Sequence, residues 1–189
     1  MARRRSIADA DLLDAALALM ATEGPEAVTF AAVSAATGLA PATLVQRFGS
    51  KPALVKAALT RAWDLLDART EDIADETEAT PAGALALLVA LSGDYAEGDA
   101  YADQLMILRE DLRDPDLRSR GRQWRERLCA ILAPRLAGRQ GPDEDGAREL
   151  TALWQGAVLW WGIERDGTPG AYVETTLGSW LRRRSLEEN

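Results

Sequence analysis

The sequence predicts an all-α protein of about nine helices, with a three-helix helix-turn-helix head at the N-terminus and a helical body after it. Apolar residues recur at spacings of three and four along most of the 189 residues, and glycine or proline interrupts this pattern at intervals of helical length. No alternation of apolar and polar residues and no hairpin signal predicts a strand. We expect a domain boundary after residue 50, so that residues 1–50 form the head and residues 51–189 form the body.

The first helix is predicted over residues 7–23. Ser6 can cap its start, and Leu13, Ala16 and Leu17 fall on one apolar stripe that would face the core. A glycine and a proline follow directly, and this pair ends the helix because neither residue continues it well.

Residues 29–54 predict two short helices joined by a tight turn. Thr29 can cap the first of them, and Gly38 stands where a left-handed residue would end it. Pro41 suits the first turn of the second helix, whose apolar side is marked by Leu44. The remaining side of the second helix is polar and points outward. This is the arrangement by which a helix-turn-helix enters a DNA major groove.

The same segment resembles the tetracycline-repressor (TetR) family of bacterial transcriptional regulators. The matching residues, at the family's spacing, are Gly38-Leu39-Ala40, Thr43-Leu44, Phe48, Ser50-Lys51 and Leu54. The resemblance covers roughly the first quarter to third of the chain. It implies a DNA-binding head, a variable helical body that senses a small molecule, and a homodimer in which the last two helices of each subunit form a four-helix bundle.

Several residues depart from the family pattern: Arg47 replaces a common histidine or tyrosine, Pro52 and Ala53 replace the usual acidic pair, and two further departures bear on the second helix. The family usually carries an aromatic residue, often a tyrosine that touches a DNA phosphate, where this chain has Val45. Ala40 stands where the family often has a serine or threonine cap, and such a cap contributes about 0.5–2 kcal/mol to a helix. These changes alter the expected contacts with DNA rather than the fold.

Candidate DNA contacts gather on the second helix of the motif and at its flanks. Gln46 can pair with adenine and Arg47 with guanine, although both could simply be solvated on an exposed face. Lys51 lies at a helix N-terminus, where a phosphate would offset its unfavourable charge. The expected contact residues are Thr29, Ala40, Ala42, Thr43, Gln46, Arg47, Lys51 and the N-terminal arm of Arg3, Arg4 and Arg5.

The charge is unevenly divided along the chain. The formal net charge is −8, yet residues 1–56 carry +1 and the remainder carries −9. Phosphate neutralisation needs only a local basic face, so the acidic total does not exclude DNA binding. Plain solubility explains the same asymmetry equally well.

The composition argues against an enzyme. Histidine is absent, which removes the commonest general base and metal ligand, and no nucleotide-binding or hydrolase motif is found. We therefore expect no catalytic residue, no metal and no cofactor. Cys129 is the single cysteine, so no internal disulfide can form. Without a run of about 18 apolar residues or a signal-peptide pattern, the expected location is the cytoplasm, away from membranes.

The body is predicted as a long connecting helix followed by shorter ones. Ser50 can cap the connecting helix, which begins near residue 51, and residues 75–83 resemble a linker. The helices expected after it cover residues 82–96, 100–113, 116–137, 147–165 and 170–185, with a loop over 138–146.

Five of the six tryptophans lie after residue 120, and apolar residues occur on more than one face of the helix over 147–165. Trp160 and Ile163 lie on a second face of that helix. A helix that is apolar on several sides must be buried on several sides, which favours a symmetric dimer. The residues expected at the dimer interface are Val158, Trp161, Leu177 and Trp180.

The other use for these aromatic side chains is a ligand pocket. The residues expected to line it are Leu91, Tyr95, Met106, Trp124 and Trp154, with ordinary core packing as the alternative for each. Aromatic faces in an acidic body favour a cationic or flat apolar ligand.

These observations predict a ligand-responsive transcriptional regulator, most simply a repressor, that binds a pseudo-palindromic double-stranded DNA operator as a homodimer. A small-molecule effector, still unidentified, would shift the population between two spacings of the heads, with the connecting helix from Lys56 onward as the lever. The alternative is a helical dimeric small-molecule-binding protein without specific DNA binding.

Overall fold

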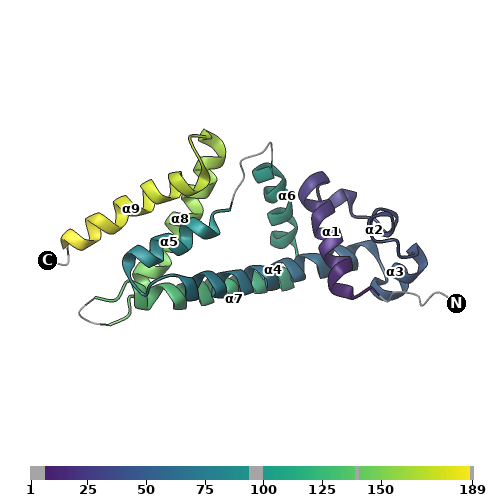
Figure 1. Ribbon diagram of the computed structural model, residues 1–189, viewed down its shortest axis with the longest axis horizontal. Coiled ribbons are helices and arrows are strands. Elements are labelled where there is room, and N and C mark those ends of the chain that lie inside the picture. Colours follow the sequence, from purple (N-terminus) through teal and green to yellow (C-terminus); the bar gives the residue numbers. More distant parts are fainter. Residues whose placement is uncertain (1–6, 94–99, 139–140, 188–189) are drawn as a thin grey trace. The chain divides into compact units, whose positions relative to one another are not determined.

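The computed structural model describes residues 7–93, 100–138 and 141–187. Within these residues the regular structure is helical, which confirms the predicted all-α class (Figure 1). In chain order the helices are α1 (Asp9–Glu23), the short 3₁₀ helix η1 (Pro25–Ala27), α2 (Phe30–Thr37), α3 (Pro41–Phe48), α4 (Lys51–Glu76), α5 (Pro81–Leu91), α6 (Ala100–Arg113), α7 (Pro115–Arg135), α8 (Glu144–Glu164) and α9 (Pro169–Glu187).

The chain divides into two compact units. The first contains residues 1–65 and 99–121, and the second contains residues 66–98 and 122–189. Two helices, α4 and α7, therefore contribute their first part to one unit and their second part to the other. A functional boundary after residue 50 stays a prediction.

The first unit has a core built by α1 to α4 and the start of α7. Leu12, Ala16 and Met20 recur along α1 at a spacing of four and are fully buried. Leu13 and Leu17 flank that stripe and are partly buried against the same core. The other fully or nearly fully buried members are Val28, Val33, Leu44, Leu54, Ala58, Leu59 and Leu117. This core fixes α2 and α3 against α1 and thereby positions the outer side of α3.

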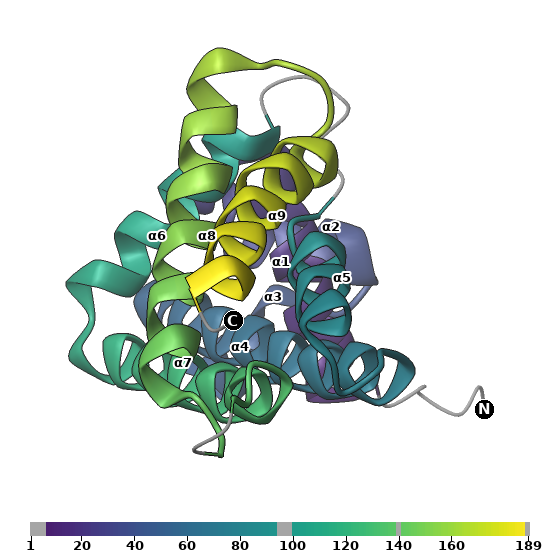
Figure 2. The same ribbon diagram turned by 90° about the vertical axis from the view of Figure 1, so that its left-hand side faces the viewer.

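The second unit packs α9 along both α8 and α5 (Figure 2). Leu87 and Leu88 of α5, Leu150 of α8 and Leu177 of α9 are fully buried there. The predicted linker is shorter than residues 75–83, because α4 continues to Glu76 and α5 begins at Pro81.

Candidate nucleic-acid interface

The turn between α2 and α3 has the local geometry that its residues predict. Thr29 caps α2, where its hydroxyl accepts a hydrogen bond from the backbone N–H of Ala32 at 3.0 Å. Gly38 ends α2 in the left-handed region at φ 72°, and its N–H donates to the carbonyl of Ser34 at 2.8 Å. A residue with a Cβ is disfavoured at that φ, so glycine permits the sharp entry into α3.

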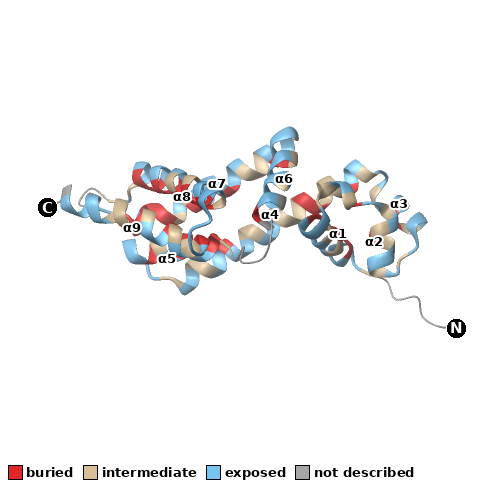
Figure 3. Ribbon diagram, turned by 90° about the horizontal axis from the view of Figure 1, so that it is seen from above, coloured by how far each residue is buried: buried red, intermediate tan, exposed pale blue. Residues whose placement is uncertain are grey.

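Helix α3 presents a polar outer side over an apolar inner one. Pro41 occupies its first turn, and Leu44 on the inner side is fully buried. Ala42 and Gln46 are exposed and Thr43 is half-buried, so the candidate base-contact positions face outward, in the largely exposed part of the chain around α3 (Figure 3).

The departures at Ala40 and Val45 are visible at α3. Ala40 is the residue before the first turn and supplies no side-chain cap. Val45 leaves 45% of its surface exposed, an unusual position for an aliphatic side chain in a small head.

Two of the candidate DNA-contacting cations bind other residues of the head. The Arg47 guanidinium donates to the carbonyl of Ile7 at 2.7 Å and pairs with the Asp9 carboxylate at 2.9 Å. The Lys51 ammonium donates to the carbonyl of Glu26 at 2.8 Å and lies 3.4 Å from the carboxylate of the same residue. Both cations must exchange these partners to reach a phosphate. Arg3, Arg4 and Arg5 lie outside the described residues.

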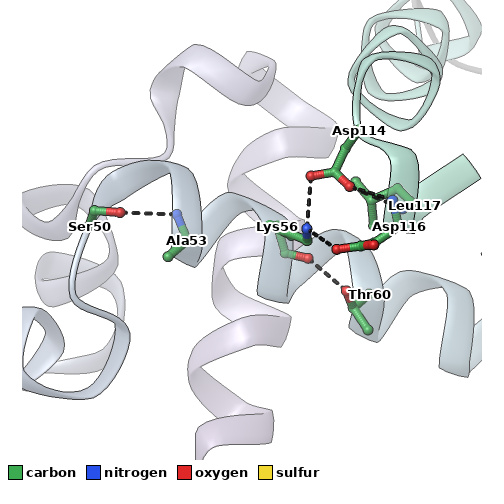
Figure 4. Close-up of polar contacts among 7 residues, drawn as sticks. All are labelled: Ser50, Ala53, Lys56, Thr60, Asp114, Asp116 and Leu117. Carbon is green, nitrogen blue, oxygen red and sulfur yellow. Dashed lines mark hydrogen bonds and ion pairs between the residues drawn. The ribbon is translucent and has the colours of Figure 1, made fainter.

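Helix α4 is anchored at its start and again one turn later (Figure 4). The Ser50 hydroxyl accepts a hydrogen bond from the N–H of Ala53 at 3.3 Å, as a cap does. The Lys56 ammonium then lies 3.0 Å from the Asp114 carboxylate and 2.6 Å from that of Asp116, at the junction of α6 and α7.

Asp114 serves two purposes in this cluster. One of its carboxylate oxygens accepts hydrogen bonds from the N–H groups of Asp116 and Leu117 and so caps α7, while the other pairs with Lys56. Hydrogen bonding to Lys56 lowers the pKa of Asp114, and the bonds to Asp116 and Asp114 raise the pKa of Lys56. The cluster ties the first turns of α4 to the α6–α7 junction. Sequence reasoning singled out Lys56 but not its partners.

Comparison with known proteins identifies the head. The family model for bacterial regulatory proteins of the tetR family matches residues 12–58, the segment that contains most of α1 and all of α2 and α3. The N-terminal part of the chain belongs to the TetR family. No curated protein matches the chain in sequence.

Solved structures share the TetR-like fold over nearly the whole chain. A protein described as a transcriptional regulator from Saccharomonospora viridis, in complex with choline, is 20% identical, with 90% of this chain and 93% of that chain covered and a TM-score of 0.68. A TetR-family member from Streptomyces coelicolor A3 is 22% identical, with 91% and 98% covered and a TM-score of 0.66. The multidrug binding protein EbrR complexed with proflavin is 20% identical, with 89% and 96% covered and a TM-score of 0.63.

Two of the tryptophans expected in a pocket are packed together. The rings of Trp124 and Trp154 lie 6.1 Å apart, and both side chains are more than nine-tenths buried. The Trp124 indole N–H donates to the Thr70 hydroxyl, and that of Trp154 donates to the Ser92 hydroxyl, each at 3.0 Å. These rings are therefore part of the core of the second unit.

The other three pocket candidates are dispersed. Leu91 is buried in the second unit, whereas Met106 belongs to the first unit and is 45% exposed on α6. Tyr95 lies outside the described residues. The described residues thus bring together Trp124 and Trp154 from the predicted set.

The residues expected at the dimer interface are mostly buried within the chain itself. Val158, Trp161 and Leu177 are at most 5% exposed, and Trp180 is half-buried, with the Arg184 guanidinium 5.4 Å from its ring. The exposed large apolar residues of α8 are Leu159, Trp160 and Ile163. The spacing of the sequence indicated two apolar faces on this helix, but it did not indicate which of them faces the core.

Neither a metal centre nor a membrane span is found among the described residues. These residues contain no group of three or more acidic or cysteine side chains that could hold a metal ion. No helix in this part of the chain is long and apolar enough to cross a bilayer.

Proposed function

We propose that the protein is a dimeric, ligand-responsive transcriptional repressor whose α3 helix enters the DNA major groove. The observation that carries this proposal is the outward polar side of α3, held by the left-handed turn at Gly38 and the buried Leu44. A fixed helix with exposed polar side chains after such a turn is the geometry that reads base edges.

The proposed contacts divide into base and phosphate contacts. Gln46 is the residue best placed to pair with a base. Thr43, Ala42 and Ala40 would contact the DNA at the start of α3. The phosphate contacts would come from the Thr29 hydroxyl, from Lys51 and Arg47 once they leave their carboxylates, and from the arm of Arg3, Arg4 and Arg5.

We propose a homodimer that forms through the outer face of α8. Leu159, Trp160 and Ile163 leave 45%, 56% and 65% of their surfaces exposed, which is unusual for neighbouring large apolar residues on one helix. Val158, Trp161 and Leu177 support that helix from inside. Two heads related by a two-fold axis would occupy major grooves about one helical turn apart on a pseudo-palindromic operator.

We further propose that a small-molecule effector binds in the body, in the region of Trp124, Trp154 and Leu91. The support is chemical: the solved relatives named above hold choline and proflavin, which are cationic ligands that aromatic faces can bind. The two rings are closely packed, so binding requires a conformation in which they separate. An effector releases DNA only to the extent that it prefers the non-binding state.

The link from α4 to the head is proposed to pass through Lys56. Its ammonium holds the α6–α7 junction against the first turns of α4, next to the cap at Ser50. A shift of α6 and α7 that displaces Asp114 and Asp116 would therefore change the position from which α4 supports α3.

One alternative is supported by specific observations. Arg47 and Lys51 are engaged by Asp9 and Glu26, and the exposed Val45 lacks the hydroxyl that family members use on phosphate. These features would also fit a helical dimeric ligand-binding protein that has lost specific DNA binding.

A selection of bound sequences from a random duplex pool at physiological salt separates the two functions. Recovery of an inverted repeat supports a dimeric sequence reader, and its spacing gives the distance between the heads. Recovery of nothing above background contradicts the proposal and supports the alternative. Repression is tested by placing the recovered repeat over a reporter promoter, where expression of the protein should lower the reporter signal.

A further inference from the structure

The second unit contains a groove between α7 and the start of α8. Its volume is about 730 Å³, which lies within the range of small-molecule sites. The α7 side presents residues that recur at helical spacing from Arg122 to Pro134, and the α8 side presents Glu144 and Arg148. None of the residues proposed above for DNA, effector or dimer contact lines this groove.

The two helices that line the groove are joined by the chain itself. The backbone N–H of Asp143 donates to the carbonyl of Ala133 at 3.0 Å, which joins the end of α7 to the start of α8. The Asp143 carboxylate caps α8 by accepting from the N–H of Gly146 at 3.0 Å, and it also pairs with Arg184. The shape of the groove therefore does not depend on a ligand.

The charge of the groove contrasts with that of the rest of the body. Arg148 is neutralised by Glu144 and Asp145, at 3.1 and 2.9 Å. Arg122 and Arg125 lie seven and four residues before Cys129, respectively, along the same side of α7, and neither forms an ion pair within the described part of the chain. Glu126 also lines the groove, so its lining holds three basic side chains against two acidic ones. Residues 57–189 carry a net charge of −9, so a groove with a basic excess is a local exception.

The groove also has an apolar side. Ala130, Ala133 and Pro134 of α7 and Pro142 of the connecting loop line it next to the arginines. A groove with arginine side chains on one side and alanine and proline side chains on the other is complementary to a ligand that has an anionic group and an apolar part. A guanidinium fork binds a carboxylate through two parallel hydrogen bonds, and such bonds are the stronger class.

We propose that this groove binds a small organic acid, with its carboxylate on Arg122 and Arg125 and its apolar part over Ala133 and Pro134. The inference is independent of DNA binding and of the aromatic effector region, for which a cationic ligand was proposed. The body would then carry two ligand sites of opposite charge preference.

Cys129 provides a reporter at the site. Its thiol lines the groove, 3.6 Å from the Thr151 hydroxyl, and it is the only cysteine of the sequence. Alkylation of the protein by the neutral reagent iodoacetamide therefore reports on one position. A ligand that occupies the groove should slow this reaction by covering the thiol.

The test uses 2-naphthoate as the probe and 2-naphthamide as its uncharged counterpart, on the full chain without DNA. Calorimetry should give a Kd of about 1 mM or tighter for naphthoate and at least about tenfold weaker binding for the amide. Naphthoate should slow alkylation of Cys129 over the same concentration range. Equal binding of the two probes, no binding of naphthoate, or binding without protection of the thiol would each overturn the proposal.

Matched variants assign the binding to the two arginines. Arg122→Gln and Arg125→Gln should each weaken naphthoate binding by about tenfold, and the double variant should bind naphthoate no better than the amide. Arg183→Gln removes the same charge from an exposed position of α9 and should leave binding unchanged. Folding of each variant is checked by circular dichroism. If Arg183→Gln weakens binding as much as the groove variants, the attraction is a general charge effect and the site is wrong.

Discussion

The ion pair that holds Lys51 leads to the sharpest prediction about DNA binding. The Lys51 ammonium lies 3.4 Å from the Glu26 carboxylate, and the two side chains are 39% and 93% exposed. Replacing Glu26 by glutamine removes the charge that competes with a phosphate, while the hydrogen bond to the Glu26 backbone carbonyl is kept. We expect Glu26→Gln to bind operator DNA more tightly than the parent protein.

The size of the effect follows from the exposure of the pair. An exposed pair of this kind contributes roughly 0.2–1 kcal/mol, so its removal should increase affinity by at most about fivefold. The slope of log K against log salt should not change, because Lys51 reaches the same phosphate in both proteins. Lys51→Gln should instead weaken binding on all sequences and reduce that slope by about 0.9.

The assay is fluorescence anisotropy with a labelled operator over a series of salt concentrations. Glu23→Gln is the matched control, because Glu23 is an exposed acidic residue of the same head without an ion pair among the described residues. In a Lys51→Gln background, Glu26→Gln should have no more effect than Glu23→Gln. If the two glutamate variants change affinity equally in the parent protein, the reasoning about Lys51 is refuted.

Three further predictions concern stability and assembly. Burial raises the pKa of Asp111 above its usual 3.8, so its protonated form stabilises the fold at low pH and this contribution is lost as pH rises through the folded pKa. Urea unfolding should therefore show Asp111→Asn gaining stability relative to the parent as pH rises above the usual carboxyl pKa of 3.8. Thr70→Val removes the hydroxyl that accepts from the buried Trp124 indole and should cost about 1–3 kcal/mol, whereas Thr175→Val on the surface should cost little. Trp160→Glu should shift a dimer toward monomer in sedimentation at an unchanged helical content; a persistent dimer would contradict the α8 interface.

The helix-turn-helix could be predicted because its signals are local. The cap at Thr29, the left-handed Gly38 and the proline at the first turn of α3 act within a few residues of their own position, so one stretch of sequence contains the information. The burial of Leu44 follows from the same helical spacing. The fold class is predictable for a similar reason, since the breakers between the helices are also local.

The partners of the charged residues could not be predicted. Arg47 pairs with Asp9, 38 residues away, and Lys56 pairs with Asp114 and Asp116 near the start of α7. Each pair depends on how separate helices pack, which no spacing within one helix determines. The sequence therefore indicated which residues carry charge in the head, but not that two of its cations are held by carboxylates.

Which apolar face of α8 is buried could not be predicted from the sequence either. Trp160 and Trp161 are adjacent, and one is 56% exposed while the other is 3% exposed. Successive residues on a helix point about 100° apart, so each of the two faces carries a tryptophan. Hydrophobicity alone therefore could not show which face is turned toward the core. The deciding contacts come from outside α8: α9 packs along this helix, and the Trp161 indole N–H donates to the carbonyl of Gly167 at 3.1 Å.

The packing around Trp124 also limits how an effector could act. The hydrogen bond from its indole to Thr70 attaches α7 to α4, the helix that carries Lys56 and supports the head. A neutral hydrogen bond of this kind contributes about 1 kcal/mol, which is about fivefold in an equilibrium. Reversing a population from 1:99 to 99:1 requires about 5.5 kcal/mol of differential affinity. Breaking this one bond therefore cannot be the switch. An effector that separates the two tryptophans must bind the opened state through several contacts of its own, and only the part of that binding absent from the closed state can release DNA.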